Sequence, residues 1–177
     1  MLITSVVVYF AVTVAIDLVT AVVVDVGEEG RLQEEPPVEV RRSVAAVEQE
    51  FYLIDSQATE QGAPQPPVFP RTGARQNKAQ TYALSEMAEF HALFGEVTQA
   101  CKAQNIPVDT LISENGPGQC EITLKHTDDI VRAADQALLM KRAIKGVAHK
   151  HGIDASFMAK PYPDLSGNGM HIHISLV

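Results

Sequence analysis

Two segments of the chain each present metal-binding side chains two residues apart. Glu48 and Glu50 lie in the segment EQEFYLID, and His171 and His173 lie in GMHIHISL. In an extended strand, residues i and i+2 point to the same face, so each segment would direct two such side chains to one side of a sheet. Carboxylates with one or two imidazoles suit hard divalent ions such as Mg²⁺ or Mn²⁺, which are common partners of phosphoryl transfer.

A third segment, ENGPGQCE, places Glu114 and Glu121 on either side of a turn. Glycine in such a turn lets the backbone approach a ligand closely, so the two carboxylates could reach one ion. They could equally be two carboxylates of a hairpin that face water. Lys160 precedes a glycine-containing loop and also has two interpretations: it could hold phosphate as a point charge, or it could be a surface lysine at a turn.

The two-residue repeats have structural interpretations as well. An isolated ExE motif is usually the solvated side of a strand, and a buried histidine is usually a hydrogen-bonded core residue. Here the sequences VAAV and FYLI that flank the first repeat are apolar. Two carboxylates in such a strand are destabilising unless they are paired or bound to metal, which favours a ligand role for Glu48 and Glu50.

Strands are the elements expected to carry these residues. Apolar, β-branched or aromatic runs predict strands over 43–55, 108–113, 119–124, 157–159 and 170–176. Residues 56–80 are polar and rich in proline, which predicts a surface loop. Strand–turn–strand units between helices indicate an α+β fold with hairpins rather than repeated βαβ units.

Helices are expected to cover this sheet. Apolar residues at helical spacing predict one helix over 84–105, with Ser85 as its N-cap. The same spacing predicts a longer helix over 128–151, with Asp128 or Thr127 as the cap and Gly152 as the stop.

The three motifs, in this order, resemble the catalytic domain of the glutamine synthetase family. The pattern is E-x-E-F-Y-L, then E-x-G-P-G-Q-x-E, then K-P-Y and G-x-G-M-H-x-H-x-S, and it extends from about residue 42 to residue 177. The sequences EQEFYLID, ENGPGQCE and GMHIHISL are most similar to the γ-glutamylpolyamine (γ-glutamylputrescine) synthetase branch. The resemblance implies a curved, largely antiparallel sheet that forms half of an open barrel, with flanking helices and the site on the concave face.

The resemblance also implies two metal ions, Mg²⁺ or Mn²⁺. The first would be bound by Glu50, Glu114 and Glu121. The second would be bound by Glu48 and His171, together with a further glutamate that the family supplies beyond residue 177.

Three residues are assigned to nucleotide and substrate by the same resemblance. His173 would lie against the phosphates of ATP, Ser175 near the nucleotide, and Gly167 in the backbone segment that receives the carboxylate of the amino acid substrate. The implied reaction is ATP-dependent ligation of glutamate to ammonia or a polyamine through γ-glutamyl phosphate. Positioning and electrostatics dominate such a reaction, so no residue is expected to act as a nucleophile.

Two functional hypotheses follow from the resemblance. The first is a truncated glutamate–amine ligase of nitrogen or polyamine metabolism, inactive alone because the family continues well beyond the HxHxS strand. The second is a non-catalytic module of the same fold that binds a divalent metal or nucleotide. Full-length family members are homo-oligomers. The acidic composition of the chain is typical of a soluble cytoplasmic protein. The identity of the amine stays open.

The composition of the chain disfavours one class of function. The 177 residues include 14 basic and 22 acidic ones, for a net charge of −8, which argues against a nucleic-acid-binding surface.

Residues 1–24 are almost wholly apolar, and the composition of residues 27–39 indicates an acidic, proline-containing linker. Residues 1–41 could be a membrane segment, a divergent soluble element or a start that is not natural protein sequence. The lack of Lys or Arg before residue 31 disfavours the membrane segment.

Overall fold

The structure, a computed structural model, describes residues 43–78 and 81–176. Its elements, in chain order, are β1 (Ser43–Asp55), α1 (Leu84–Glu89), α2 (His91–Ala103), β2 (Val108–Ser113), β3 (Gln119–Leu124), α3 (Ile130–Lys150), β4 (Ile153–Ser156) and β5 (Met170–Leu176). The expectations for residues 1–41 lie outside the described residues. Within the described ranges, no helix is long and apolar enough to cross a membrane.

The long strand β1 is the centre of the sheet, and all its pairings are antiparallel. One edge of β1 pairs with β3, which in turn pairs with β2. The other edge is shared, because β5 pairs with residues 43–49 and β4 with residues 52–55. The described strands form an antiparallel sheet that does not close into a barrel. The predicted α+β fold with an open, largely antiparallel sheet and flanking helices is confirmed.

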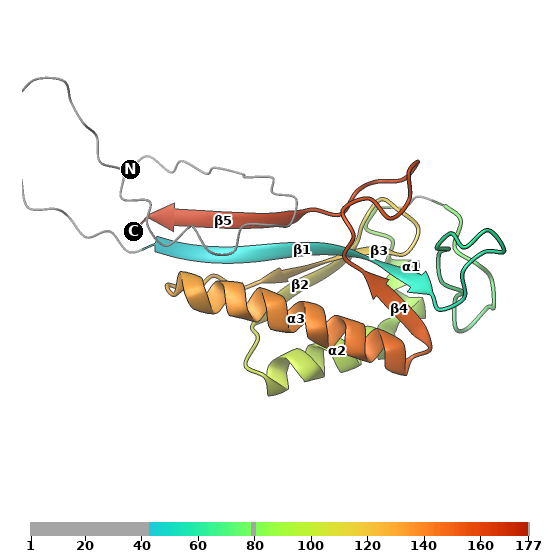
Figure 1. Cartoon of the computed structure of the whole chain (residues 1–177). Coiled ribbons are helices and arrows are strands. Elements are labelled where there is room, and N and C mark those ends of the chain that lie inside the picture. Colours follow the sequence, from blue (N-terminus) through green and yellow to red (C-terminus); the bar gives the residue numbers. More distant parts are fainter. Residues whose placement is uncertain (1–42, 79–80, 177) are drawn as a thin grey trace, which may run out of the picture.

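The hydrophobic core lies on one face of this sheet. Phe51 and Leu53 of β1 are fully buried and pack with residues of α2 and α3, among them Val97, Met140 and Ile144. Figure 1 shows α2 and α3 lying along the same side of the sheet. Since side chains alternate along a strand, the even-numbered residues of β1 point to the opposite face, where the predicted ligands lie.

The predicted helix over 84–105 is two helices, separated at Phe90. The backbone of Phe90 has φ −103° and ψ 17°, outside the helical region. Its ring is buried, 6.0 Å from the ring of Phe69 and 6.4 Å from that of Phe94. The prediction of one continuous helix was wrong because packing against the loop that precedes α1, rather than local spacing, sets the direction of the chain here.

The predicted start of this helix was also wrong. Ala83, not Ser85, occupies the N-cap position and makes no side-chain hydrogen bond there. The backbone N–H of Ala83 donates instead to Oγ of Ser113, at 2.6 Å, so β2 fixes the start of α1. Leu84, expected on the apolar face, is 84% exposed.

The strand predicted over 157–159 lies a few residues too late. The observed strand is β4, and its register with β1 pairs Ile153 with Asp55 and Ser156 with Tyr52. Phe157 follows the strand and packs into the core, with its ring 5.3 Å from that of Phe51. Its apolar character therefore reflects burial of one ring rather than a continuing strand.

The longest helix, α3, begins and ends with recognisable local signals. Its N-cap is Asp129, whose side chain accepts a hydrogen bond from the backbone N–H of Arg132 at 2.9 Å. The prediction of Asp128 or Thr127 as the cap was wrong by one or two residues. The predicted stop is confirmed, since Gly152 has a φ of 76°, which glycine adopts without strain.

Asp129→Ala is expected to lower the free energy of unfolding by about 1 kcal/mol, because the helix loses its only side-chain cap. Urea unfolding of the whole chain measures the change. Asp128→Ala is the matched control, since it removes the same charge from an exposed neighbour. Equal losses in the two variants would show that charge, rather than the cap, stabilises this end of α3.

Candidate metal centre

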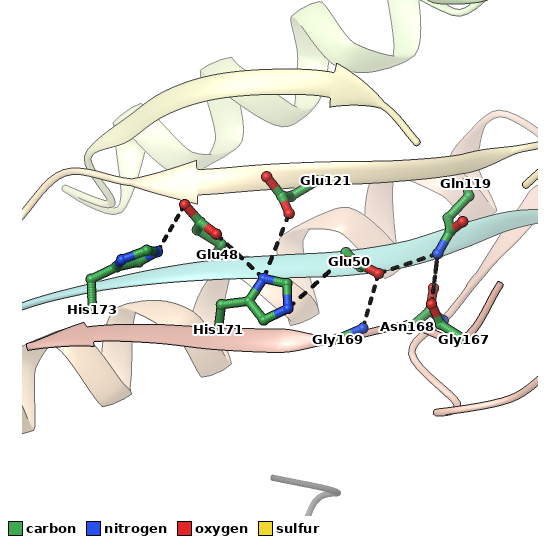
Figure 2. Close-up of polar contacts among 9 residues, drawn as sticks. All are labelled: Glu48, Glu50, Gln119, Glu121, Gly167, Asn168, Gly169, His171 and His173. Atoms are coloured by element: carbon green, nitrogen blue, oxygen red, sulfur yellow. Dashed lines mark hydrogen bonds and ion pairs between the residues drawn. The ribbon is translucent and has the colours of Figure 1, made fainter. Parts of the chain in front are cut away.

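Three neighbouring strands place the predicted ligands at matching positions on one face of the sheet. Glu48 on β1 is the register partner of His171 on β5, and Glu50 is the partner of Glu121 on β3. Register partners in an antiparallel pair have their side chains on the same face. The two-residue spacing seen in the sequence therefore brings distant segments to one cluster (Figure 2).

His171 lies among the carboxylates of this cluster (Figure 2). Its Nδ1 is 3.3 Å from Oε2 of Glu48 and 3.9 Å from Oε2 of Glu121. Its Nε2 is 4.0 Å from Oε1 of Glu50. Potential ligand atoms of Glu48, Glu121 and His171 all lie within 4.8 Å of one another, a spacing that suits ligands about 2.0–2.6 Å from one shared ion.

The carboxylates of this centre raise one another's proton affinity. Burial, together with the charges of Glu48, Glu114 and Glu50, raises the pKa of Glu121 to about 7. Burial and the charge of Glu50 also raise the pKa of Glu114. Acids that destabilise one another's charge at neutral pH form a favourable site for a cation. Oxygen ligands with one imidazole fit Mg²⁺ or Mn²⁺.

Glu114 lies outside the group of Glu48, Glu121 and His171, whose potential ligand atoms are close to one another. Its backbone N–H donates to the carbonyl of Gln119 at 2.8 Å and closes the β2–β3 hairpin. Its carboxylate still acts on the centre, since its charge raises the pKa of Glu121. The group of Glu48, Glu121 and His171 combines residues that the sequence analysis assigned to different ions. Glu121 was assigned to the first ion, and Glu48 and His171 to the second. The division of the five ligands between two ions stays a prediction.

The residues predicted to contact nucleotide and substrate lie on either side of this centre. Nε2 of His173 is 3.0 Å from Oε1 of Glu48, so His173 joins the cluster. Ser175 is exposed further along β5, as the register partner of Val44. Gly167 lies in the loop before β5.

Two residues that organise the site were missed by the sequence analysis. Gln119 is only 1% exposed and donates from Nε2 to Oε2 of Glu50, at 3.2 Å. Tyr52 is fully buried and donates from its hydroxyl to the carbonyl of Ser166, at 2.8 Å. Burial and the charge of Glu50 raise the pKa of Tyr52 to about 12. The signal was available, because each lies two residues from a predicted ligand on the same strand.

Comparisons with known proteins agree with the family resemblance. The family described as glutamine synthetase, catalytic domain, matches residues 34–177. γ-Glutamylputrescine synthetase PuuA of Escherichia coli (strain K12) is 44% identical over 133 residues, which are 75% of this chain and 28% of that protein. Glutamate–isopropylamine ligase of a Pseudomonas species is 36% identical over 132 residues, with the same coverage of 75% and 28%.

Solved structures agree as well. A complex of GmaS with ADP matches with a TM-score of 0.63 and 26% identity, over 77% of this chain and 29% of that one. The chain spans 28% of the length of the two curated relatives. The predicted resemblance, including the similarity to a γ-glutamylputrescine synthetase, is confirmed. Because the family match covers most of the sequence, the chain belongs to the glutamine synthetase catalytic-domain family.

Proposed function

We propose that this chain takes part in the ATP-dependent ligation of glutamate to an amine, as the metal-binding part of a glutamine synthetase-like catalytic domain formed by residues 42–177. The observation that carries the proposal is the convergence of Glu48, Glu50 and Glu121 on His171. The names of the two relatives, a γ-glutamylputrescine synthetase and a glutamate–isopropylamine ligase, favour an organic amine over ammonia.

The carboxylates have one main role in this proposal, which is to hold cations. Glu50, Glu114 and Glu121 bind one Mg²⁺ or Mn²⁺, and Glu48 with His171 binds a second. Ions bound there would neutralise the negative charge of a phosphoryl group during its transfer from ATP. Burial and the repulsion of neighbouring carboxylates raise the pKa of Glu121 to about 7 without metal, and this supports the role, because a cation offsets both effects.

The neighbouring residues position the reactants. His173 would lie against the phosphates of ATP, Ser175 would lie near the nucleotide, and the backbone at Gly167 would receive the α-carboxylate of glutamate. The side-chain carboxylate of glutamate would attack the γ-phosphorus of ATP, so that ADP leaves and an acyl phosphate forms. The amine would then attack the acyl carbon, lose a proton and displace phosphate. Assembly into a homo-oligomer and a cytoplasmic location are part of the same proposal.

Titration of the purified chain with Mn²⁺ tests the metal centre. Electron paramagnetic resonance measures free Mn²⁺ directly, so saturable loss of the free-ion signal at pH 8 is the expected result. A chain that leaves the signal unchanged would contradict the proposal at its first step.

A chimaera tests the reaction. The 133 aligned residues of the E. coli synthetase are replaced by those of this chain. Amide formation from glutamate, ATP and putrescine is then measured, with ammonia and ethylamine as competing acceptors. Turnover is expected. Binding of Mn²⁺ by the chain without turnover by the chimaera would instead favour the non-catalytic binding module.

A further inference from the structure

Gln119 uses both ends of a buried side-chain amide. Its Oε1 accepts a hydrogen bond from the backbone N–H of Gly116, at 3.0 Å. Its Nε2 donates to Oε2 of Glu50 at 3.2 Å and to the carbonyl of Gly167 at 2.9 Å, and it lies 3.3 Å from Oδ1 of Asn168. Because a backbone N–H can only donate, it fixes which end of the amide is the oxygen, so the NH₂ group must face Glu50.

Glu50 is held at one oxygen and turned toward the cluster with the other. Its Oε2 accepts a second hydrogen bond, from the backbone N–H of Gly169 at 3.0 Å. Its Oε1 is the atom 4.0 Å from Nε2 of His171. Both donors are neutral, so they orient the carboxylate while leaving its full negative charge, which an Arg or Lys donor would offset.

The same contacts connect two parts of the site. Gly167, Asn168 and Gly169 form the loop that enters β5, and Figure 2 shows Gly167 and Asn168 on the opposite side of Glu50 from His173, with Gly169 beside Glu50. Asn168 also donates to the carbonyl of Met158 at 2.9 Å, which ties the loop to the segment after β4. Gln119 therefore contacts both this loop and a predicted metal ligand.

We infer that Gln119 is a positioning residue of the metal centre. It holds Oε2 of Glu50, so that Oε1 faces the cluster, and it fixes the Gly167–Gly169 loop to the same carboxylate. The inference rests on the proposed metal-binding function and adds a residue that has no role in that proposal.

Gln119→Leu removes the donor and keeps a side chain of similar size. The affinity for Mn²⁺ is expected to fall by about 10- to 100-fold, the usual effect of losing an outer-shell hydrogen bond to a ligand. Gln136→Leu is the matched control. Gln136 lies on α3, away from the metal centre, and is also buried. Its Nε2 donates a hydrogen bond to the carbonyl of Asn105, at 3.1 Å. The control should leave Mn²⁺ affinity unchanged, whatever its effect on unfolding.

A double-mutant cycle with Glu50→Gln separates positioning from general structural support. If Gln119 acts through Glu50, Gln119→Leu should have little further effect on Mn²⁺ affinity once the Glu50 carboxylate is absent. Circular dichroism checks folding, and Gln119→Met replaces the leucine variant if that does not fold. Unchanged affinity in the single variant, or independent losses in the cycle, would overturn the inference and leave the metal centre intact. No Mn²⁺ binding by the unaltered chain would overturn both.

Discussion

Glu121→Gln is expected to raise the stability of the metal-free chain at pH 8 and to weaken its binding of Mn²⁺. The two effects have one cause. Glu121 lies in a cluster with Glu48, Glu50 and His171, and its side chain is only 12% exposed. Without a cation, its charge is poorly solvated and repelled by its neighbours. With a cation, the same charge becomes a ligand.

The pH dependence gives the sign of the stability effect. The pKa of Glu121 is raised from 4.5 to about 7 in the folded chain, so the folded state binds its proton more tightly than the unfolded state does. Its stabilising contribution is complete below pH 4.5 and is lost as the pH rises through about 7. Glutamine has no such titration. The free energy of unfolding of the variant should therefore exceed that of the parent by about 3 kcal/mol at pH 8 and match it below pH 4.5.

Urea unfolding at about pH 4 and pH 8, without metal, measures the first effect, and titration with Mn²⁺ measures the second. The loss of affinity should be at least about tenfold, since removing a ligand exceeds the effect of an outer-shell change. Glu86→Gln is the matched control, because burial also raises the pKa of Glu86, which lies in α1 outside the cluster. It should stabilise the chain at pH 8 without changing Mn²⁺ affinity. If Glu121→Gln bound Mn²⁺ as tightly as the parent, Glu121 would not be a ligand.

The sequence was enough to predict which site residues share a face of the sheet, because side chains alternate along a strand. A strand alternates its side chains, so Glu48 with Glu50, and His171 with His173, had to share a face once each segment was recognised as a strand. The bounds of β1, β2, β3 and β5 were confirmed for the same reason, since apolar and β-branched runs mark them directly. The register between strands was not predictable, because it is fixed by long-range pairing.

The errors have a common physical origin in tertiary contacts. The break at Phe90 follows from the burial of its ring, and the start of α1 follows from a hydrogen bond to Ser113. Its spacing from Glu121 places Gln119 on the site face of β3, but its role depends on partners in the turn before it, in β1 and in the loop before β5. None of these contacts is visible in a local pattern of residues.

Gly116→Ala is expected to destabilise the chain by about 3 kcal/mol, through overpacking against a buried ring. A Cβ on Gly116 would lie 2.0 Å from the hydroxyl oxygen of Tyr52 and 2.6 Å from its Cζ. Tyr52 is fully buried, and its ring is 5.0 Å from that of Tyr162. Its hydroxyl also donates to the carbonyl of Ser166, so the ring cannot move away without losing that bond.

The clash should also reach the metal centre. The backbone N–H of Gly116 donates to Oε1 of Gln119, whose other end holds Glu50. A shift of the turn away from Tyr52 would disturb this connection, so the alanine variant should bind Mn²⁺ more weakly as well as unfold at lower urea concentration. Both quantities are measured on the same preparation of the whole chain.

Gly95→Ala is the matched control for this prediction. Gly95 is an exposed residue of α2, and a Cβ there would meet nothing within 4 Å. Alanine is the better helix former, so this variant should gain about 0.5–1 kcal/mol and keep its Mn²⁺ affinity. The two substitutions add the same methyl group, and opposite signs are expected only because Tyr52 occupies the space beside Gly116. If both alanines stabilised the chain, the close approach of the turn to Tyr52 would not constrain the site.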